Sequence, residues 1–144
     1  PPGLANALGL LLTLFVRPAI KQGVPIFMLT KPTRGSGAGT LQTGLSIVAF
    51  GRDVTTVKFQ ADDAELAKTL LSEARSGASA VFFDNVVGSI DAPSLAQATT
   101  TGKLRGRVLG QTRMIEAPFR MVVVFAGNRP TLSEELVDRA VLLD

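Results

Sequence analysis

A glycine-rich run in the first third of the chain contains the residue types that surround a bound phosphate group. It follows the apolar segment 25–30. Glycines let successive backbone N–H groups turn toward one anion, and a helix that begins after them directs its positive N-terminus to the same point. The candidate phosphate-binding residues are Thr33, Arg34, Gly35, Ser36, Gly37, Ala38, Gly39 and Thr40. The run alone is also compatible with a plain connection between a strand and a helix.

The lysine that completes such a loop is absent from this run. A complete phosphate loop places a lysine after its last glycine, where it reaches the β and γ phosphates, and a neighbouring hydroxyl holds Mg²⁺. Here Ala38 occupies the lysine position, and Thr40 supplies the first hydroxyl. The alanine is explained either by an engineered Lys→Ala substitution that disables the loop or by natural loss of the lysine. In both cases we expect hydrolysis to be about 30- to 1000-fold slower than with lysine.

Three polar residues farther along the chain stand where triphosphate hydrolysis needs them. Asp84 ends the apolar segment 79–84, where an acid can hold Mg²⁺ through water. Asn128 follows the apolar segment 120–125, where an amide can position the attacking water. Arg139 precedes the last apolar segment, where an arginine can reach a γ-phosphate bound by a neighbouring subunit. Singly, these residues are also typical of a strand end, a turn and a solvated surface.

Short apolar segments alternate with helical ones along the chain, which predicts an α/β fold. The apolar segments are continuous, so we expect a mostly parallel sheet of five strands covered on both faces, in a three-layer α/β/α arrangement. The predicted strands are 25–30, 54–59, 79–84, 120–125 and 140–143. The predicted helices are 4–16, 40–50, one from Asp62 or Asp63 to Gly77, one that begins near Pro93, and one opened by a capping box at 131–134. The segments 107–109 and 113–117 are predicted to pair as a hairpin.

Composition removes several classes of chemistry. The 144 residues include no cysteine and no histidine, which excludes disulfides, thiolate metal sites and histidine-based catalysis. Any reaction must therefore use carboxylates, hydroxyls, amides, lysine or arginine. The 15 Lys and Arg residues against 12 Asp and Glu residues give a net charge of +3, which fits a phosphate ligand but does not by itself indicate one.

The N-terminal segment is the most apolar part of the chain. Arg17 and Pro18 interrupt it before the ~20 apolar residues that a bilayer requires, so we expect a helix on the core or an interface, and no membrane contact. We divide the chain into this helix at 1–24 and a nucleotide-binding core at 25–144. The absence of an initiator Met and the end at Asp144 lead us to expect a piece of a longer protein, and the lack of cysteine favours a cytoplasmic location.

Five short motifs together resemble the core of an AAA+-like P-loop ATPase family. Members occur in bacteria, phages and mobile elements, often as ATP-binding or replication-associated proteins. The motifs are Leu10-Leu-Leu-Thr-Leu-Phe-Val-Arg-Pro18, Pro32-Thr-Arg-Gly-Ser-Gly37, Phe83-Asp-Asn-Val86, Arg107-Val-Leu-Gly110 and Phe125-Ala-Gly-Asn128, and the segment 133–144 matches the same pattern.

The resemblance implies a role for each matching residue. Gly35, Ser36, Gly37, Gly39 and Thr40 would line the triphosphate of ATP, with Mg²⁺ held by Thr40 and Asp84. Asn128 would be the first sensor and Arg139 the arginine finger. Asn85 stands where such enzymes usually have a catalytic glutamate, so the base is open, with Asp91 and Glu116 as candidates. The small helical lid that usually follows the core is absent from this sequence.

The resemblance leads us to expect a homo-oligomeric ring, such as a hexamer, that works on DNA during replication. Basic residues in the predicted hairpin region could meet the phosphates of DNA, or form a solvated surface. They are Lys103, Arg105, Arg107 and Arg113. Two other functions stay open: a non-catalytic scaffold that binds nucleotide or nothing, and a phosphotransferase similar to the nucleoside-monophosphate kinases.

Overall fold

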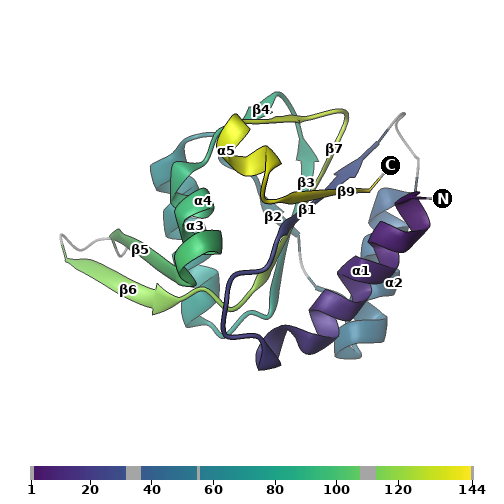
Figure 1. Cartoon of the computed structure of the whole chain (residues 1–144), viewed down its shortest axis with the longest axis horizontal. Helices are drawn as coiled ribbons and strands as arrows, with labels where there is room; N and C mark the ends of the chain where they lie inside the picture. The colour runs from purple at the N-terminus through teal and green to yellow at the C-terminus, as the bar shows by residue number, and fades with distance from the viewer. Residues whose placement is uncertain (1, 32–36, 55, 108–112, 144) are drawn as a thin grey trace.

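The computed structural model describes residues 2–31, 37–54, 56–107 and 113–143. Its centre is a sheet of five parallel strands (Figure 1) in the order β2-β3-β7-β1-β9. The strands are β1 (Ile26–Thr30), β2 (Thr56–Lys58), β3 (Ala80–Val86), β7 (Val122–Gly127) and β9 (Ala140–Leu143). All six residues of β7 are buried, as its continuous apolar sequence predicts. The predicted α/β fold with a mostly parallel five-stranded sheet is confirmed.

Helices cover both faces of the sheet and complete the three layers (Figure 1). The helices α1 (Pro2–Val16) and α2 (Ala38–Phe50) pack on one face, where Leu10, Leu14 and Leu45 join the strand side chains in one apolar cluster. The helices α3 (Asp63–Arg75) and α4 (Pro93–Thr101) pack on the other face around a second cluster. In that cluster Phe83 and Phe125 stack with ring centres 5.1 Å apart.

The ends of the helices follow local sequence signals. The side chain of Asp62 accepts a hydrogen bond from the backbone N–H of Glu65 at 3.0 Å and so caps α3. Gly51 ends α2 in the left-handed conformation, with φ of 69°, and Pro93 occupies the first turn of α4. These starts and stops agree with the predictions.

The predicted hairpin is confirmed with an earlier start, whereas one predicted helix start is wrong. The hairpin consists of β5 (Lys103–Arg107) and β6 (Met114–Pro118), so its first strand begins before the predicted 107, and the predicted positions 108–109 lie outside the described residues. Thr131 does not begin a helix, because it lies in the two-residue strand β8 (Thr131–Leu132), which pairs in parallel with β4 (Ser89–Ile90). The short helix α5 (Glu134–Val137) begins three residues later, after Ser133, whose side chain makes no capping hydrogen bond.

Arg17 ties the N-terminal segment to the core. It lies at the start of the short 3-10 helix η1 (Arg17–Ala19) and its side chain is fully buried. The guanidinium group donates hydrogen bonds to the backbone carbonyls of Ile20, Gln22, Phe119 and Met121. Burial, with a smaller contribution from the charge of Arg120, lowers the pKa of Arg17.

The helix α1 has one face on the core and one face exposed. Leu10 and Leu14 are buried against the sheet, whereas Leu4, Leu8 and Leu12 are more than half exposed. Both predicted positions of this helix, on the core and on an interface, remain compatible with that pattern. Among the described helices, none combines the length and the apolar character that crossing a bilayer requires.

Candidate functional site at the carboxyl edge of the sheet

Three strands end side by side at the edge where Asp84, Asn85 and Asn128 stand. The end of β7 lies between the end of β1 and the end of β3, because Gly127 pairs with Thr30 on one side and with Val86 on the other. Asn128 follows Gly127 directly. The resemblance requires this arrangement, with the strand of the sensor asparagine between the phosphate-loop strand and the acid strand. Open parallel sheets bind ligands outside the carboxyl ends of their strands.

A β-bulge places Asp84 and Asn85 at this edge. The pairing between β3 and β7 passes from Phe83 with Phe125 to Val86 with Gly127, so β3 has one extra residue. Bulges bend a strand and redirect its side chains, and they are frequent beside active sites. Asn85 takes the left-handed conformation, with φ of 55°, which asparagine tolerates better than most residues. The bulge thus breaks the regular alternation of side chains where the predicted magnesium-binding acid stands.

Gly127 permits the close approach of β7 to this bulge. A Cβ atom added to Gly127 would overlap the carbonyl oxygen of Val86 and stand 2.9 Å from its carbonyl carbon. The obstructing atoms belong to the backbone, so they have no rotamer that relieves the overlap. Only glycine fits here without separation of the two strands.

Asp84 forms an ion pair with Lys31, the residue that follows β1. The ammonium group of Lys31 donates to Oδ1 of Asp84, and the backbone N–H of Asn85 donates to the same oxygen at 2.7 Å. Burial alone raises the pKa of the Asp84 carboxyl, but the hydrogen bonds from Lys31 and Asn85, together with the charge of Lys31, outweigh it. The net pKa of Asp84 lies below its ordinary value, so the group is a carboxylate at neutral pH.

The helix α2 is the next described element after β1 in the chain, which is the strand-then-helix order of the phosphate-loop prediction. Gly37 precedes it with φ of 83°, and its carbonyl accepts from the backbone N–H of Leu41 at 2.8 Å. Ala38 is half-buried and packs against the apolar cluster under the helix, whereas Gly39 and Thr40 are exposed. The first turn of a helix has backbone N–H groups without partners in the helix, which can bind an anion. The candidates Thr33, Arg34, Gly35 and Ser36 lie outside the described residues.

The described side chains at this edge fit Mg²⁺ only in combination with other ligands. Among the described residues, no three acidic groups gather in one place. Magnesium in nucleotide sites commonly takes one or two carboxylates, with phosphates and water as its other ligands, so Asp84 suits that mode. An open depression of about 570 Å³ adjoins Asp84 on the side away from Lys31. Its lining includes Thr56, Lys58, Phe59, Asp84, Asn85 and Val87.

Arg139 lies at the opposite edge of the sheet. Its backbone carbonyl accepts from the N–H of Ile26, the first residue of β1, so it stands at the amino end of the parallel strands. The five steps from Ile26 to Lys31 correspond to about 16 Å along the strand direction. Its guanidinium group donates to the Thr100 hydroxyl at 3.1 Å and to the carbonyl of Glu135. Arg139 is therefore separated from Asp84 and Asn128 of its own chain.

The basic residues of the predicted DNA contact lie together on the β5–β6 hairpin, which protrudes from the body of the protein in Figure 1. Lys103, Arg105 and Arg107 alternate along β5 with Leu104 and Gly106, so the three cations share the exposed face of the strand. Leu104 is buried, and a Cβ atom added to Gly106 would stand 3.4 Å from the side chain of Leu71 on α3.

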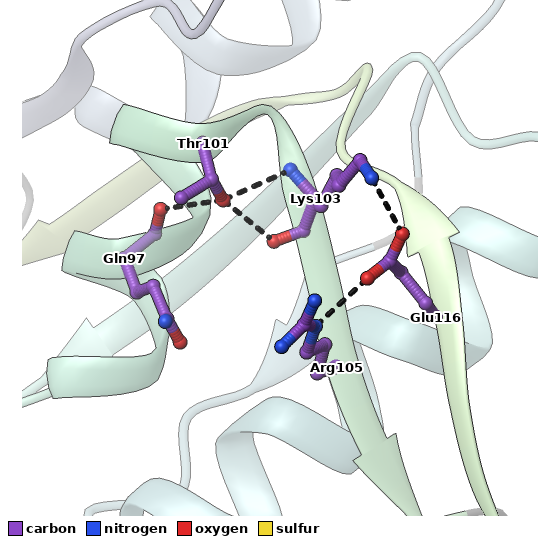
Figure 2. Close-up of polar contacts among 5 residues, drawn as sticks. All are labelled: Gln97, Thr101, Lys103, Arg105 and Glu116. Carbon is purple, nitrogen blue, oxygen red and sulfur yellow. Dashed lines mark hydrogen bonds and ion pairs between the residues drawn. The ribbon is translucent and has the colours of Figure 1, made fainter.

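Glu116 neutralises part of this charge, as Figure 2 shows. One carboxylate oxygen binds Lys103 at 2.8 Å and the other binds Arg105 at 2.7 Å. The hydrogen bond from Lys103 makes the largest contribution to lowering the pKa of Glu116, and the hydrogen bond from Arg105 comes next. The hydroxyl of Thr101 fixes the start of the strand, since it donates to the Gln97 carbonyl at 2.9 Å and accepts from the N–H of Lys103 at 3.3 Å (Figure 2). Arg107 and Arg113 are exposed.

Lys31 is the site residue that the sequence predictions missed. A lysine after an apolar strand normally reads as a solvated charge, and its partner Asp84 is 53 positions away.

Comparison of the sequence with models of known protein families and with curated proteins gives no match.

Proposed function

We propose that the chain is the ATP-binding core of a ring-forming, AAA+-like ATPase in which Ala38 weakens hydrolysis. The observation that carries the proposal is the strand order, which brings Asp84 and Asn128 to one edge of the sheet beside the end of β1, the strand that precedes α2 in the chain. In this proposal the N-terminus of α2 binds phosphate oxygens. Asp84 and Thr40 hold Mg²⁺, and Asn128 orients the attacking water.

The position of Arg139 supports assembly with other copies. An arginine that acts on the γ-phosphate must reach it, and Arg139 is about 16 Å along the sheet from the phosphate edge of its own chain. A neighbouring subunit in a ring could receive it at its own phosphate edge. For this, Arg139 would exchange its hydrogen bonds to Thr100 and Glu135 for contacts with the neighbour's phosphate.

DNA is the polymer that we propose for the ring, on the basis of the exposed cations of the hairpin. A basic strand face binds phosphates without reading sequence, which suits a protein that moves along a nucleic acid. The ion pairs with Glu116 leave Arg107 and Arg113 as the better candidates for this contact. A cytoplasmic location accords with this proposal.

Binding and turnover of ATP by this chain and by its Ala38→Lys variant test the proposal, with the mass of each in solution measured with and without nucleotide. We expect the variant to bind MgATP, to hydrolyse it faster than the chain with alanine, and to form larger assemblies in its presence. If neither protein binds ATP, the glycine-rich run is structural and a scaffold function replaces our proposal. Phosphoryl transfer to a nucleoside monophosphate in place of hydrolysis would instead indicate a kinase.

A further inference from the structure

The backbone of Lys31 is fixed at the centre of the carboxyl edge. Its N–H donates to the carbonyl of Gly127 at 2.8 Å, which extends the pairing of β1 with β7 by one residue. Because β7 lies between β1 and β3, the backbones of β1 and β3 are about 10 Å apart. The side chain of Lys31 therefore crosses the end of β7 to reach Asp84.

The ion pair of Lys31 and Asp84 is only partly buried. The exposed fractions of the two side chains are 15% and 28%, so a ligand can reach both groups. A lysine side chain is flexible and donates up to three hydrogen bonds, which allows it to exchange one anion for another. A triphosphate carries more negative charge than one carboxylate and therefore competes for the ammonium group.

We propose that Lys31 supplies the positive charge that Ala38 lacks. This inference rests on the proposed function. The ammonium group leaves Asp84 when a nucleoside triphosphate binds and donates to its β and γ phosphate oxygens from the β1 side of the site. Asp84 is then free to hold hydrated Mg²⁺. Lys31 thus acts as a phosphate-binding residue that reaches the phosphates from the strand instead of from the helix.

Lys58 gives a matched control for this role. It is opposite Asp84 in the pairing of β2 with β3, so it lies on the other side of the acid from Lys31. Its side chain is exposed and lines the depression beside Asp84. Lys58→Met and Lys31→Met remove the same charge from the same edge of the sheet. A difference in ATP affinity between the two variants therefore reports the position of the lysine rather than the total charge.

The experiment is a calorimetric titration of MgATP, ADP and AMP into six proteins. They are the unchanged chain, Lys31→Met, Lys31→Arg, Lys58→Met, Ala38→Lys and the double variant Lys31→Met/Ala38→Lys. We expect Lys31→Met to weaken ATP binding by about 10- to 100-fold, the effect of one lost hydrogen bond between charged groups. The loss should be smaller for ADP and near zero for AMP. Lys31→Arg should retain part of the affinity, and Lys58→Met should change it by less than about 3-fold.

The Ala38→Lys background separates this inference from the proposed function. If Lys31 replaces the missing lysine, Lys31→Met costs less in that background than in the unchanged chain. Three results would overturn the role of Lys31 and leave the nucleotide site in place. They are an equal loss of ATP affinity in both backgrounds, an equal loss for Lys31→Met and Lys58→Met, and a loss of affinity that extends to AMP. The role is also overturned if only the proteins with Lys at position 38 bind ATP. If no protein binds ATP, the proposed function fails first.

Discussion

Alanine at position 127 should destabilise the protein, whereas alanine at position 44 should stabilise it. Gly127 is in β7 against the bulge of β3, and an added Cβ would come within 2.9 Å of the Val86 carbonyl carbon and closer to its oxygen. Gly44 is exposed on α2, and an added Cβ would meet no atom within 4 Å. The same chemical change therefore meets backbone at one position and open space at the other.

The size of each effect follows from these contacts. Separation of the two strands at Val86 costs the energy of overpacking, about 1–3 kcal/mol, and weakens a ladder hydrogen bond worth about 1 kcal/mol. Gly127→Ala should therefore lower the free energy of unfolding by about 2–4 kcal/mol. Gly44→Ala should raise it by about 0.5–1 kcal/mol, because alanine is the better helix former.

Urea unfolding followed by circular dichroism measures both changes under one protocol. We expect the midpoint to fall for Gly127→Ala and to rise for Gly44→Ala, with unchanged dependence on urea concentration. The altered strand separation should also weaken ATP binding by Gly127→Ala, because Asn128 is the next residue. A Gly127→Ala variant as stable as the unchanged chain would refute the close approach of β7 to β3.

Two further predictions concern Arg17 and the hairpin. Arg17→Met should lower the free energy of unfolding by about 3–5 kcal/mol, because four backbone carbonyls lose a charged donor. Arg52→Met, at an exposed position, should change it by less than about 0.5 kcal/mol. Similar changes for the two variants would contradict the buried role of Arg17. Joint replacement of Arg107 and Arg113 by Gln should weaken the binding of single-stranded DNA and reduce the slope of its salt dependence by about 1.4, which fluorescence anisotropy can measure. Lys68→Gln on α3 should change neither the affinity nor the slope. An unchanged slope would remove the hairpin from the proposed DNA contact.

The sequence predicts the strands of the sheet well because strands that are buried on both faces consist of continuous apolar runs. Residues 122–127, all buried, need no tertiary information to be recognised as a covered strand. The caps Asp62 and Gly51 are equally local, because their effect depends on residues within one turn. The strand β8 escaped prediction because two residues are too few to show a period, and its partner β4 is distant in the chain.

The polar contacts of the site were harder to predict because they join distant parts of the chain. The motifs and the resemblance indicated Asp84 and Asn128, and the strand order gives them a common edge. Lys31 carries no motif, and only the fold brings it to Asp84. Arg17 appeared in the sequence as an interruption of an apolar run, whereas its burial depends on carbonyls as far away as Met121. Local patterns indicate which residues are polar but not which distant partner each one meets.

Our proposal for this edge is that it binds ATP and that Ala38 limits the hydrolysis of ATP. Its most direct test is the rate of phosphate release from MgATP by the Ala38→Lys variant beside the unchanged chain. We predict a rate at least about 30-fold higher for the variant, because lysine restores a charged partner of the transferring phosphate. Equal rates, with no binding of ATP by either protein, would show that this edge is not an ATP site.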